Sequence, residues 1–398
     1  MLSRVLQRTT RSLTGAVDRA VLERVLTPLP AAREPIESLS HSERIAALQT
    51  FAAFYDRPEH FTPETRFFSR SAAPQLRERA VRRFGRQRPR RRQGEVIDLS
   101  WSSGFEPLWS EPSAAASFAS VLEGLDRDAH AQLSRSIRSL RECERRLGLQ
   151  LRYGAGEPAN QTMWARWFRH RNGPRPCAVI LHGYLGGTLA VEEYMWPIQA
   201  LFDRGLDIVL TVLPMHGARA GVRGRFRLPG FPAVDPRLAV EGFRQLVHEH
   251  LTLFDYLLDG RVSALGVMGM SLGGYSAALL GTLDPRLQFG VFYMPLASVA
   301  DFALRTGRMV GDEAEQREQA ALLERVYRCV SPLARPSRLP RGKTLVLAGE
   351  ADQITGLPHG NQLVEQFGAS FCTYAGSHIL PLGRDAAFDA AWRMLELA

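Results

Sequence analysis

The chain has 398 residues, 45% of them hydrophobic, which is enough for one large domain with an extension or for two domains. Its net charge of +9 raises the question of a nucleic-acid or anionic-membrane partner. Lysine occurs once, at Lys343, so nearly all of the positive charge is arginine and is spread along the whole sequence. This distribution argues against a nucleic-acid-binding patch. No run of about 18 uninterrupted apolar residues occurs, which argues against a membrane-spanning helix.

The cysteines indicate neither a zinc site nor a disulfide framework. The four of them are scattered and form no Cys-x-x-Cys pair. The N-terminus also lacks the hydrophobic core and small-residue cleavage site of a secretory signal. We therefore expect a cytoplasmic protein; the cysteines are Cys143, Cys177, Cys329 and Cys372.

Residues 1–94 are predicted to be an N-terminal helical extension. In residues 1–26, apolar side chains recur every three or four positions, with arginines between them, which predicts an amphipathic helix. This helix either docks on its own protein, the reading we favour, or lies on an anionic membrane surface as a peripheral contact. Ser40 and Glu43 form a capping-box pattern for a helix to about Tyr55, and residues 62–64 open another short helix. Residues 82–92 are a basic run typical of a solvated linker.

From Glu95 onward, apolar strands alternate with helical segments, which predicts a mostly parallel sheet with helices on both faces. We assign residues 95–398 to this domain. A helical insertion at about 299–330 is expected to form a small cap. Expected strands are 96–101, 163–168, 177–181, 207–213, the run before Ser271, 288–293, 344–348 and 370–374; expected helices are a long one ending near Leu147, one through Tyr194 to Arg204, 238–258, and 386–397.

The pattern Gly-x-Ser-x-Gly occurs at residues 269–273, between an apolar run and a small-residue helical segment. This is the strand–turn–helix context that the motif requires. The turn is so tight that Gly269 and Gly273 are needed for their lack of a Cβ. Ser271 is then expected at the apex, where the start of the next helix aims N–H groups at developing negative charge.

A serine hydroxyl is a weak nucleophile, so it needs a base, and the base needs a group that orients it. Two acids, Glu350 and Asp352, directly follow the strand at 344–348, and His378 follows the strand at 370–374. Because the carboxyl ends of parallel strands meet at one edge of a sheet, we expect these side chains on the same rim as Ser271.

With His182-Gly183-Tyr184 added, the combined motifs resemble the α/β-hydrolase superfamily over about residues 160–397. The resemblance implies an α/β-hydrolase fold, with Ser271 as nucleophile, His378 as base and then acid, and Asp352 as the orienting carboxylate. Asp352 fits the family position better than Glu350, which remains the alternative. Residues 1 to about 150 are not covered by the resemblance.

The same resemblance implies an oxyanion hole made of two backbone N–H groups, from Leu272 and from Tyr184. His182 is usually a residue that shapes this loop in the superfamily, and His216 follows a strand end. We name His182 and His216 as candidate pocket residues. No metal-binding motif is present, and no cofactor or metal is expected.

The predicted function is a cofactor-free serine hydrolase that cleaves a carboxylic ester through an acyl-enzyme. The expected substrate is a small-molecule ester or a lipid-like ester, with no nucleic-acid partner. Three alternatives stay open: an acyltransferase, a thioesterase or amidase on the same fold, and a non-catalytic interaction protein that retains the fold.

Overall fold

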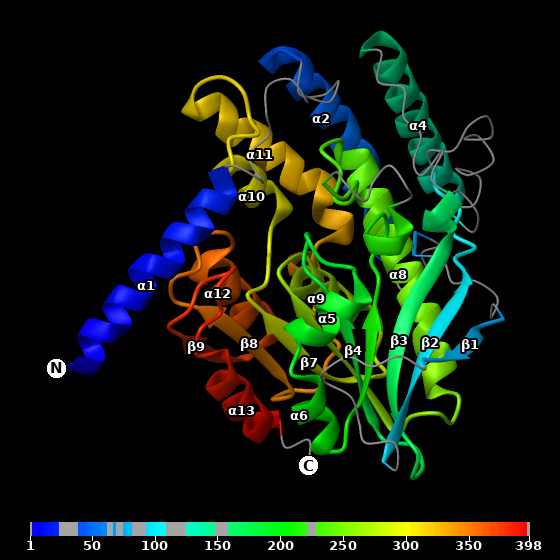
Figure 1. The fold of residues 1–398 in the computed structure, drawn as a ribbon. Coiled ribbons are helices and arrows are strands. Elements are labelled where there is room, and N and C mark those ends of the chain that lie inside the picture. The colour runs from blue at the N-terminus through cyan, green and yellow to red at the C-terminus, as the bar shows by residue number, and fades with distance from the viewer. Residues whose placement is uncertain are drawn as a thin grey trace.

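A mixed sheet of nine strands organises the described part of the chain in this computed structural model (Figure 1). The spatial order of the strands is β1-β2-β3-β5-β4-β6-β7-β8-β9. The six strands from β5 to β9 are parallel, whereas β1, β2, β3 and β5 pair antiparallel. The structure describes residues 2–23, 39–61, 67–68, 75–81, 93–108, 125–147, 158–220 and 228–395.

The strands correspond to the apolar runs of the sequence. In β4, β5 and β8 every residue, or every residue but the first, is buried, as expected for strands with helices on both faces. The bounds are β1 Arg77–Ala80, β2 Gly94–Ser102, β3 Thr162–His170, β4 Pro176–Leu181, β5 Asp207–Thr211, β6 Ala264–Met270, β7 Leu287–Tyr293, β8 Thr344–Gly349 and β9 Ser370–Tyr374.

Helices cover both faces of the sheet, which confirms the predicted architecture. The side chains of α8, α9 and α12 join one buried apolar cluster, and those of α6 and α13 join the cluster on the other face. The helices are α1 Leu2–Val21, α2 His41–Tyr55, α4 Arg127–Leu147, α5 Leu189–Met195, α6 Ile198–Asp203, α8 Pro236–Leu258, α9 Leu272–Leu283, α10 Val299–Arg305, α11 Glu313–Tyr327, α12 Gly356–Phe367 and α13 Arg384–Leu395.

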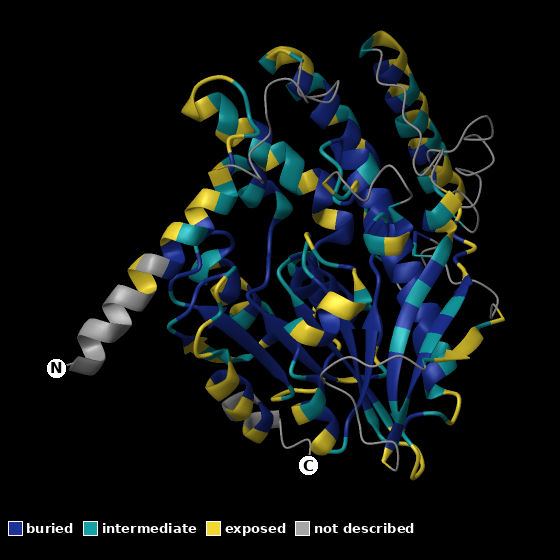
Figure 2. Cartoon of the chain, viewed as in Figure 1, coloured by how far each residue is buried: buried dark blue, intermediate teal, exposed yellow. Residues whose placement is uncertain are grey.

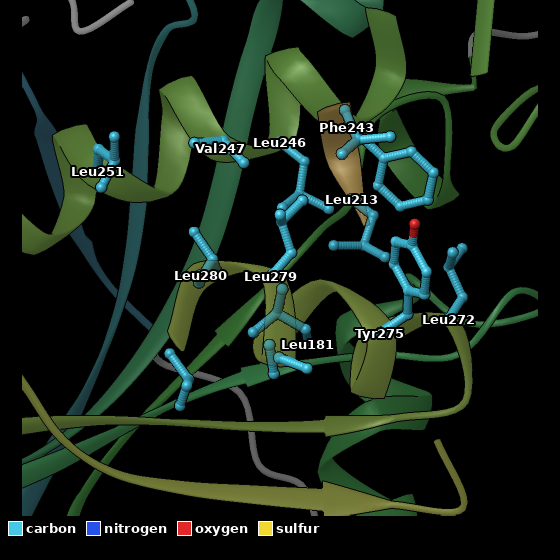
Figure 3. Packing of buried hydrophobic residues seen from close by; sticks show 14 of the residues in the cluster. Leu181, Leu213, Phe243, Leu246, Val247, Leu251, Leu272, Tyr275, Leu279 and Leu280 are labelled. Carbon is cyan, nitrogen blue, oxygen red and sulfur yellow. The ribbon is translucent and has the colours of Figure 1, made fainter. Parts of the chain in front are cut away.

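The packing of α8 on α9 fixes the helix that follows Ser271. Phe243 and Leu246 of α8 face Tyr275 and Leu279 of α9, above Leu181 at the end of β4 (Figure 3). The rings of Phe243 and Tyr275 lie 4.9 Å apart, and both residues are almost fully buried. The central strands of the sheet below them are buried along most of their length (Figure 2). Since close-packed interiors resist displacement, the N-terminus of α9 has a defined position against the sheet.

Two elements differ from the sequence prediction for local reasons. The helix expected through Tyr194 to Arg204 is divided into α5 and α6, with Pro197 between them, because a proline removes a helical hydrogen bond. β1 lies inside the predicted helical extension and pairs with β2. All four of its residues are exposed and three are charged, so it has no apolar alternation to reveal it.

The predicted N-terminal helices form where the structure describes them. The capping box of Ser40 and Glu43 is present at the start of α2. The predictions for residues 24–26, 62–64, 82–92 and 396–397 lie outside the described residues, and the long helix predicted to end near Leu147 is α4. Among the described helices, none has the length and apolar character needed to cross a bilayer.

The segment predicted to form a cap contains α10 and α11, and α11 packs against α2 (Figure 1). Arg325 and Arg328, at the end of α11, both contact the Asp56 carboxylate, at 3.0 and 2.8 Å. Arg305 of α10 donates to the Thr355 carbonyl at 3.1 Å. The insertion is therefore joined to the N-terminal part of the chain and to the loop after β8. The domain boundaries and a covering role for the insertion stay predictions.

Candidate active site

The loops after β8 and β9 bring together a buried carboxylate and a buried imidazole. Nδ1 of His378 lies 2.8 Å from Oδ2 of Asp352. The other carboxylate oxygen accepts the backbone N–H groups of Ile354 and Thr355, at 2.8 and 3.0 Å. Because Asp352 is ionised and accepts from Nδ1–H, the Nε2 atom of His378 is left to act as a base.

Asp352 and His378 each stabilise the charged form of the other. Burial by itself raises the pKa of Asp352, but the His378 charge and the hydrogen bonds from His378, Thr355 and Ile354 lower it to about 2. Burial lowers the pKa of His378, but the carboxylates of Asp352 and Asp18 outweigh this effect and raise it above the usual value. Asp352 therefore stays ionised at neutral pH and stabilises an imidazolium.

Glu350, the alternative acid, lies elsewhere. Its carboxylate accepts the Thr373 hydroxyl at 2.9 Å and pairs with Arg11 of α1. The structure thus gives His378 a hydrogen bond to Asp352, and the partners of Glu350 are on β9 and α1.

Ser271 occupies a strained turn between β6 and α9. Its φ is 55° and its ψ is −115°, a backbone conformation that is costly for a residue with a side chain. The two glycines of the motif make the turn feasible. A Cβ on Gly269 would overlap the Gly273 carbonyl, and a Cβ on Gly273 would overlap the Leu181 carbonyl. The side chain of Ser271 is partly exposed at the carboxyl edge of the sheet.

This turn and the acid–base pair are joined by the end of β7. The Ser271 N–H donates to the Tyr293 carbonyl at 3.0 Å. The Thr355 hydroxyl, which lies 2.8 Å from Oδ2 of Asp352, shares its single proton with the next carbonyl, of Met294, at 3.2 Å. A Gly-x-Ser-x-Gly turn at the carboxyl edge of a mostly parallel sheet, followed in the chain by acid and histidine, decides the fold.

The chain has the α/β-hydrolase fold. In such folds the nucleophile turn, the acid loop and the histidine loop meet at this edge. Among the described residues, no hydrogen bond joins the Ser271 hydroxyl to His378, so that third contact belongs to the function proposed below.

In this α/β-hydrolase fold, the loop after β4 lies beside Ser271. A Cβ built on Gly183 would be 3.6 Å from the Ser271 Cβ. Tyr184 is held at two points: its carbonyl lies 2.8 Å from Nε2 of His216, and its hydroxyl donates to the Pro229 carbonyl at 3.2 Å. Leu272 is the first residue of α9. The two predicted oxyanion donors, Tyr184 and Leu272, thus belong to segments that flank the nucleophile turn.

His182 and His216, the candidate pocket residues, bind backbone atoms. Nε2 of His182 accepts the Leu213 N–H at 3.0 Å, and its Nδ1 lies 2.7 Å from the Gly183 carbonyl. Burial lowers the pKa of both histidines, to about 4 for His216. These neutral rings support the loop that carries Tyr184. Within the described ranges, no three His, Cys, Asp or Glu side chains are grouped as metal ligands.

No protein-family model matches the chain. Two uncharacterized proteins of Mycobacterium tuberculosis, from strains CDC 1551 and H37Rv, are each 32% identical over 200 residues, or 49% of this chain. The chain spans about half the length of these curated relatives, 47% of each.

Among solved structures, the chain is similar to acetyl xylan esterases of Paenibacillus sp. R4 and Thermoanaerobacterium sp. JW/SL YS485. The first has a TM-score of 0.49 and 13% identity, covering 95% of this chain and 98% of that one. The second has a TM-score of 0.48 and 15% identity, covering 88% and 98%. Both TM-scores are below 0.5. The sheet and the turn at Ser271, and not these similarities, identify the fold.

Two residues of this site were absent from the sequence prediction. Thr355 donates its hydroxyl to Asp352 at 2.8 Å and follows it by three positions, a spacing that resembles a helix-capping turn before α12. Asp18 of α1 binds the loops of both Asp352 and His378. The available signal for Asp18 was a single acid near the apolar face of an otherwise basic helix.

We expect Gly273→Ala to destabilise the protein strongly, because the added methyl group would overlap the Leu181 carbonyl. The expected loss in free energy of unfolding is about 3 kcal/mol, the upper end of typical overpacking costs. Gly281→Ala in the same helix is the control: its Cβ would meet side chains and no backbone among its three nearest atoms, Leu339 at 3.0 Å and Phe367 at 3.5 Å, and the change should stay within about 1 kcal/mol. Urea unfolding of both variants measures the difference, and equal stabilities would contradict the account of the turn.

The pH dependence of activity should follow His378. As the predicted base, His378 must be neutral to accept a proton, and its pKa is raised by the facing carboxylates of Asp352 and Asp18. We therefore expect kcat/KM for an uncharged ester to fall with decreasing pH, with the midpoint of the acid limb above about 6.5, the ordinary histidine value. A midpoint near pH 4 would instead indicate a carboxylate base.

Proposed function

We propose that this protein is a serine hydrolase that cleaves carboxylic esters through a Ser271–His378–Asp352 triad and an acyl-enzyme. The observation that carries the proposal is the buried Asp352–His378 hydrogen bond of 2.8 Å at the sheet edge that also holds the strained turn of Ser271. The similar solved structures named above are acetyl xylan esterases, which agrees with the proposal without carrying it.

In the proposed reaction, the Ser271 hydroxyl attacks the ester carbonyl while Nε2 of His378 takes its proton. Asp352 holds the resulting imidazolium. The oxyanion accepts the N–H groups of Leu272 and Tyr184, and the imidazolium then protonates the leaving alcohol. Water attacks the acyl-enzyme with His378 as base again, which releases the acid and restores Ser271. In apo structures the nucleophile–base hydrogen bond is often long and tightens only when substrate binds.

The acyl group of the substrate is proposed to be apolar. Three exposed leucines lie near the proposed machinery: Leu185 follows Tyr184, Leu228 precedes the Pro229 carbonyl that binds the Tyr184 hydroxyl, and Leu380 follows His378 by two positions. Their side chains offer apolar surface at the edge where the ester would enter. A lipid-like or alkyl ester therefore fits better than a charged one. The four cysteines are free, and we keep the cytoplasm as the proposed compartment.

Initial rates on p-nitrophenyl esters of increasing acyl length test this proposal. We expect repeated turnover in water, with kcat/KM rising from acetyl to medium-length chains. Turnover only when an alcohol acceptor is added would favour the acyltransferase alternative. Hydrolysis of matching acyl thioesters or p-nitroanilides, but of no ester, would favour the thioesterase or amidase alternative. Neither turnover nor a burst of p-nitrophenol on any ester would contradict the proposal and favour a non-catalytic protein.

A further inference from the structure

The carboxylate of Asp18, on the helix nearest the N-terminus, is completely buried against the loops of the proposed acid and base. Its Oδ2 accepts the N–H of Gln353 at 3.1 Å and the N–H of His378 at 2.8 Å. Its Oδ1 accepts the Ser377 hydroxyl and the Ile379 N–H, both at 2.9 Å. One side chain thus receives four hydrogen bonds from two loops.

These two loops carry the residues whose relative position matters. Gln353 is the neighbour of Asp352 in the loop after β8, whereas residues 377–379 form the loop after β9 around His378. The two loops follow adjacent parallel strands. Because a single oxygen of Asp18 binds an N–H from each loop, it fixes the distance between the backbone segments of acid and base.

The location of Asp18 within α1 indicates that it is there for this contact. It lies in the last turn of the helix, where the helix dipole disfavours a negative charge. Burial of an unpaired carboxylate is also costly, and here the four donors offset that cost. Two other residues of α1 also approach the loop after β8. A Cβ on Gly15 would lie 3.3 Å from the Ala351 carbonyl, and Arg11 pairs with Glu350.

We propose that Asp18 is a positioning residue of the active site and that the hydrolase therefore needs α1 for full activity. Asp18 acts through His378 and Asp352, and it touches neither the substrate nor the reacting atoms. The inference rests on the proposed function for its catalytic consequence. Its structural half, that Asp18 orders the two loops, is independent of that function. Figure 1 shows α1 reaching the body of the protein at its C-terminal end, near α10 and α12.

The test is Asp18→Asn in the full chain, with Glu23→Gln as the matched control. Asparagine keeps the shape of the side chain but turns a donor toward backbone N–H groups. Glu23 is exposed just beyond α1, so its variant makes the same charge change without these contacts. We expect kcat on a p-nitrophenyl ester to fall about 10- to 100-fold in Asp18→Asn, with KM little changed, because a small displacement of a catalytic group has effects of this size. Glu23→Gln should behave as wild type.

Two further readouts separate positioning from general loss of structure. Amide hydrogen exchange in the peptides containing Gln353 and His378 should become faster in Asp18→Asn, with the core strands unchanged. The acid limb of kcat/KM should move to lower pH, because one of the two carboxylates facing His378 has lost its charge while Asp352 remains.

If the kcat, the pH profile and the hydrogen exchange of Asp18→Asn all equal those of the wild type, the inference is overturned while the proposed function stands. Should wild-type protein itself show no ester turnover, the proposed function fails, and the exchange measurement still decides whether Asp18 holds the loops. If Asp18→Asn does not fold, Ser377→Ala replaces it, since it removes one of the four donors. A smaller fall in kcat with faster exchange supports the inference, and no change in either overturns it.

Discussion

Ser271→Ala should reduce ester hydrolysis by about 10⁴-fold or more. The reason is that no other described side chain occupies the apex of the turn between β6 and α9, and a methyl group has no atom to form the acyl-enzyme. Losses of this size are typical when the nucleophile of a catalytic triad is removed. The initial rate on the best p-nitrophenyl ester, with active enzyme concentration determined by burst titration of wild type, measures the effect.

Ser263→Ala is the matched control for that variant. Ser263 is exposed and lies just before β6, so its hydroxyl is eight positions from the turn. We expect unchanged activity. If Ser271→Ala retained more than about a tenth of the wild-type rate, with the same folded fraction, another nucleophile would have to be responsible.

Asp352→Asn should lower kcat by about 10⁴-fold. An asparagine at this position keeps the acceptor for the N–H groups of Ile354 and Thr355 but presents a donor to Nδ1 of His378. The imidazole then carries its proton on Nε2, the atom that must accept the proton of Ser271. Loss of a triad carboxylate has this magnitude when the wrong tautomer is stabilised.

Glu350→Gln provides the comparison for the acid. Glu350 contacts Thr373 and Arg11 and has no contact with His378. The variant should keep most of the activity. A large loss in Glu350→Gln together with a small loss in Asp352→Asn would reverse the assignment of the acid.

The sheet was predictable because its parallel strands are covered on both faces and so have few polar positions. The runs that became β4, β5, β6 and β8 are apolar almost throughout, and the predicted segments agree with them closely. The turn at Ser271 was predictable for a different reason: both motif glycines are demanded by backbone atoms that leave no room for a Cβ. Local constraints of this kind are visible in a single sequence.

Contacts between distant segments were not predictable in the same way. The hydrogen bonds of Asp18 join residues 335 to 361 positions apart, and no local pattern encodes the partner of a buried carboxylate. The strand β1 is charged and exposed, so only its pairing with β2 identifies it. The helical packing of α2 on α11 likewise depends on tertiary structure, although the α2 capping box was visible in advance.

Labelling with a fluorophosphonate probe, followed by peptide mapping, tests the central claim most directly. The probe phosphonylates a serine hydroxyl only when a neighbouring base activates it. The account predicts one adduct, on Ser271, that is absent in Ser271→Ala and strongly reduced in His378→Ala. An unlabelled wild-type protein, or an adduct that persists in Ser271→Ala, would contradict it.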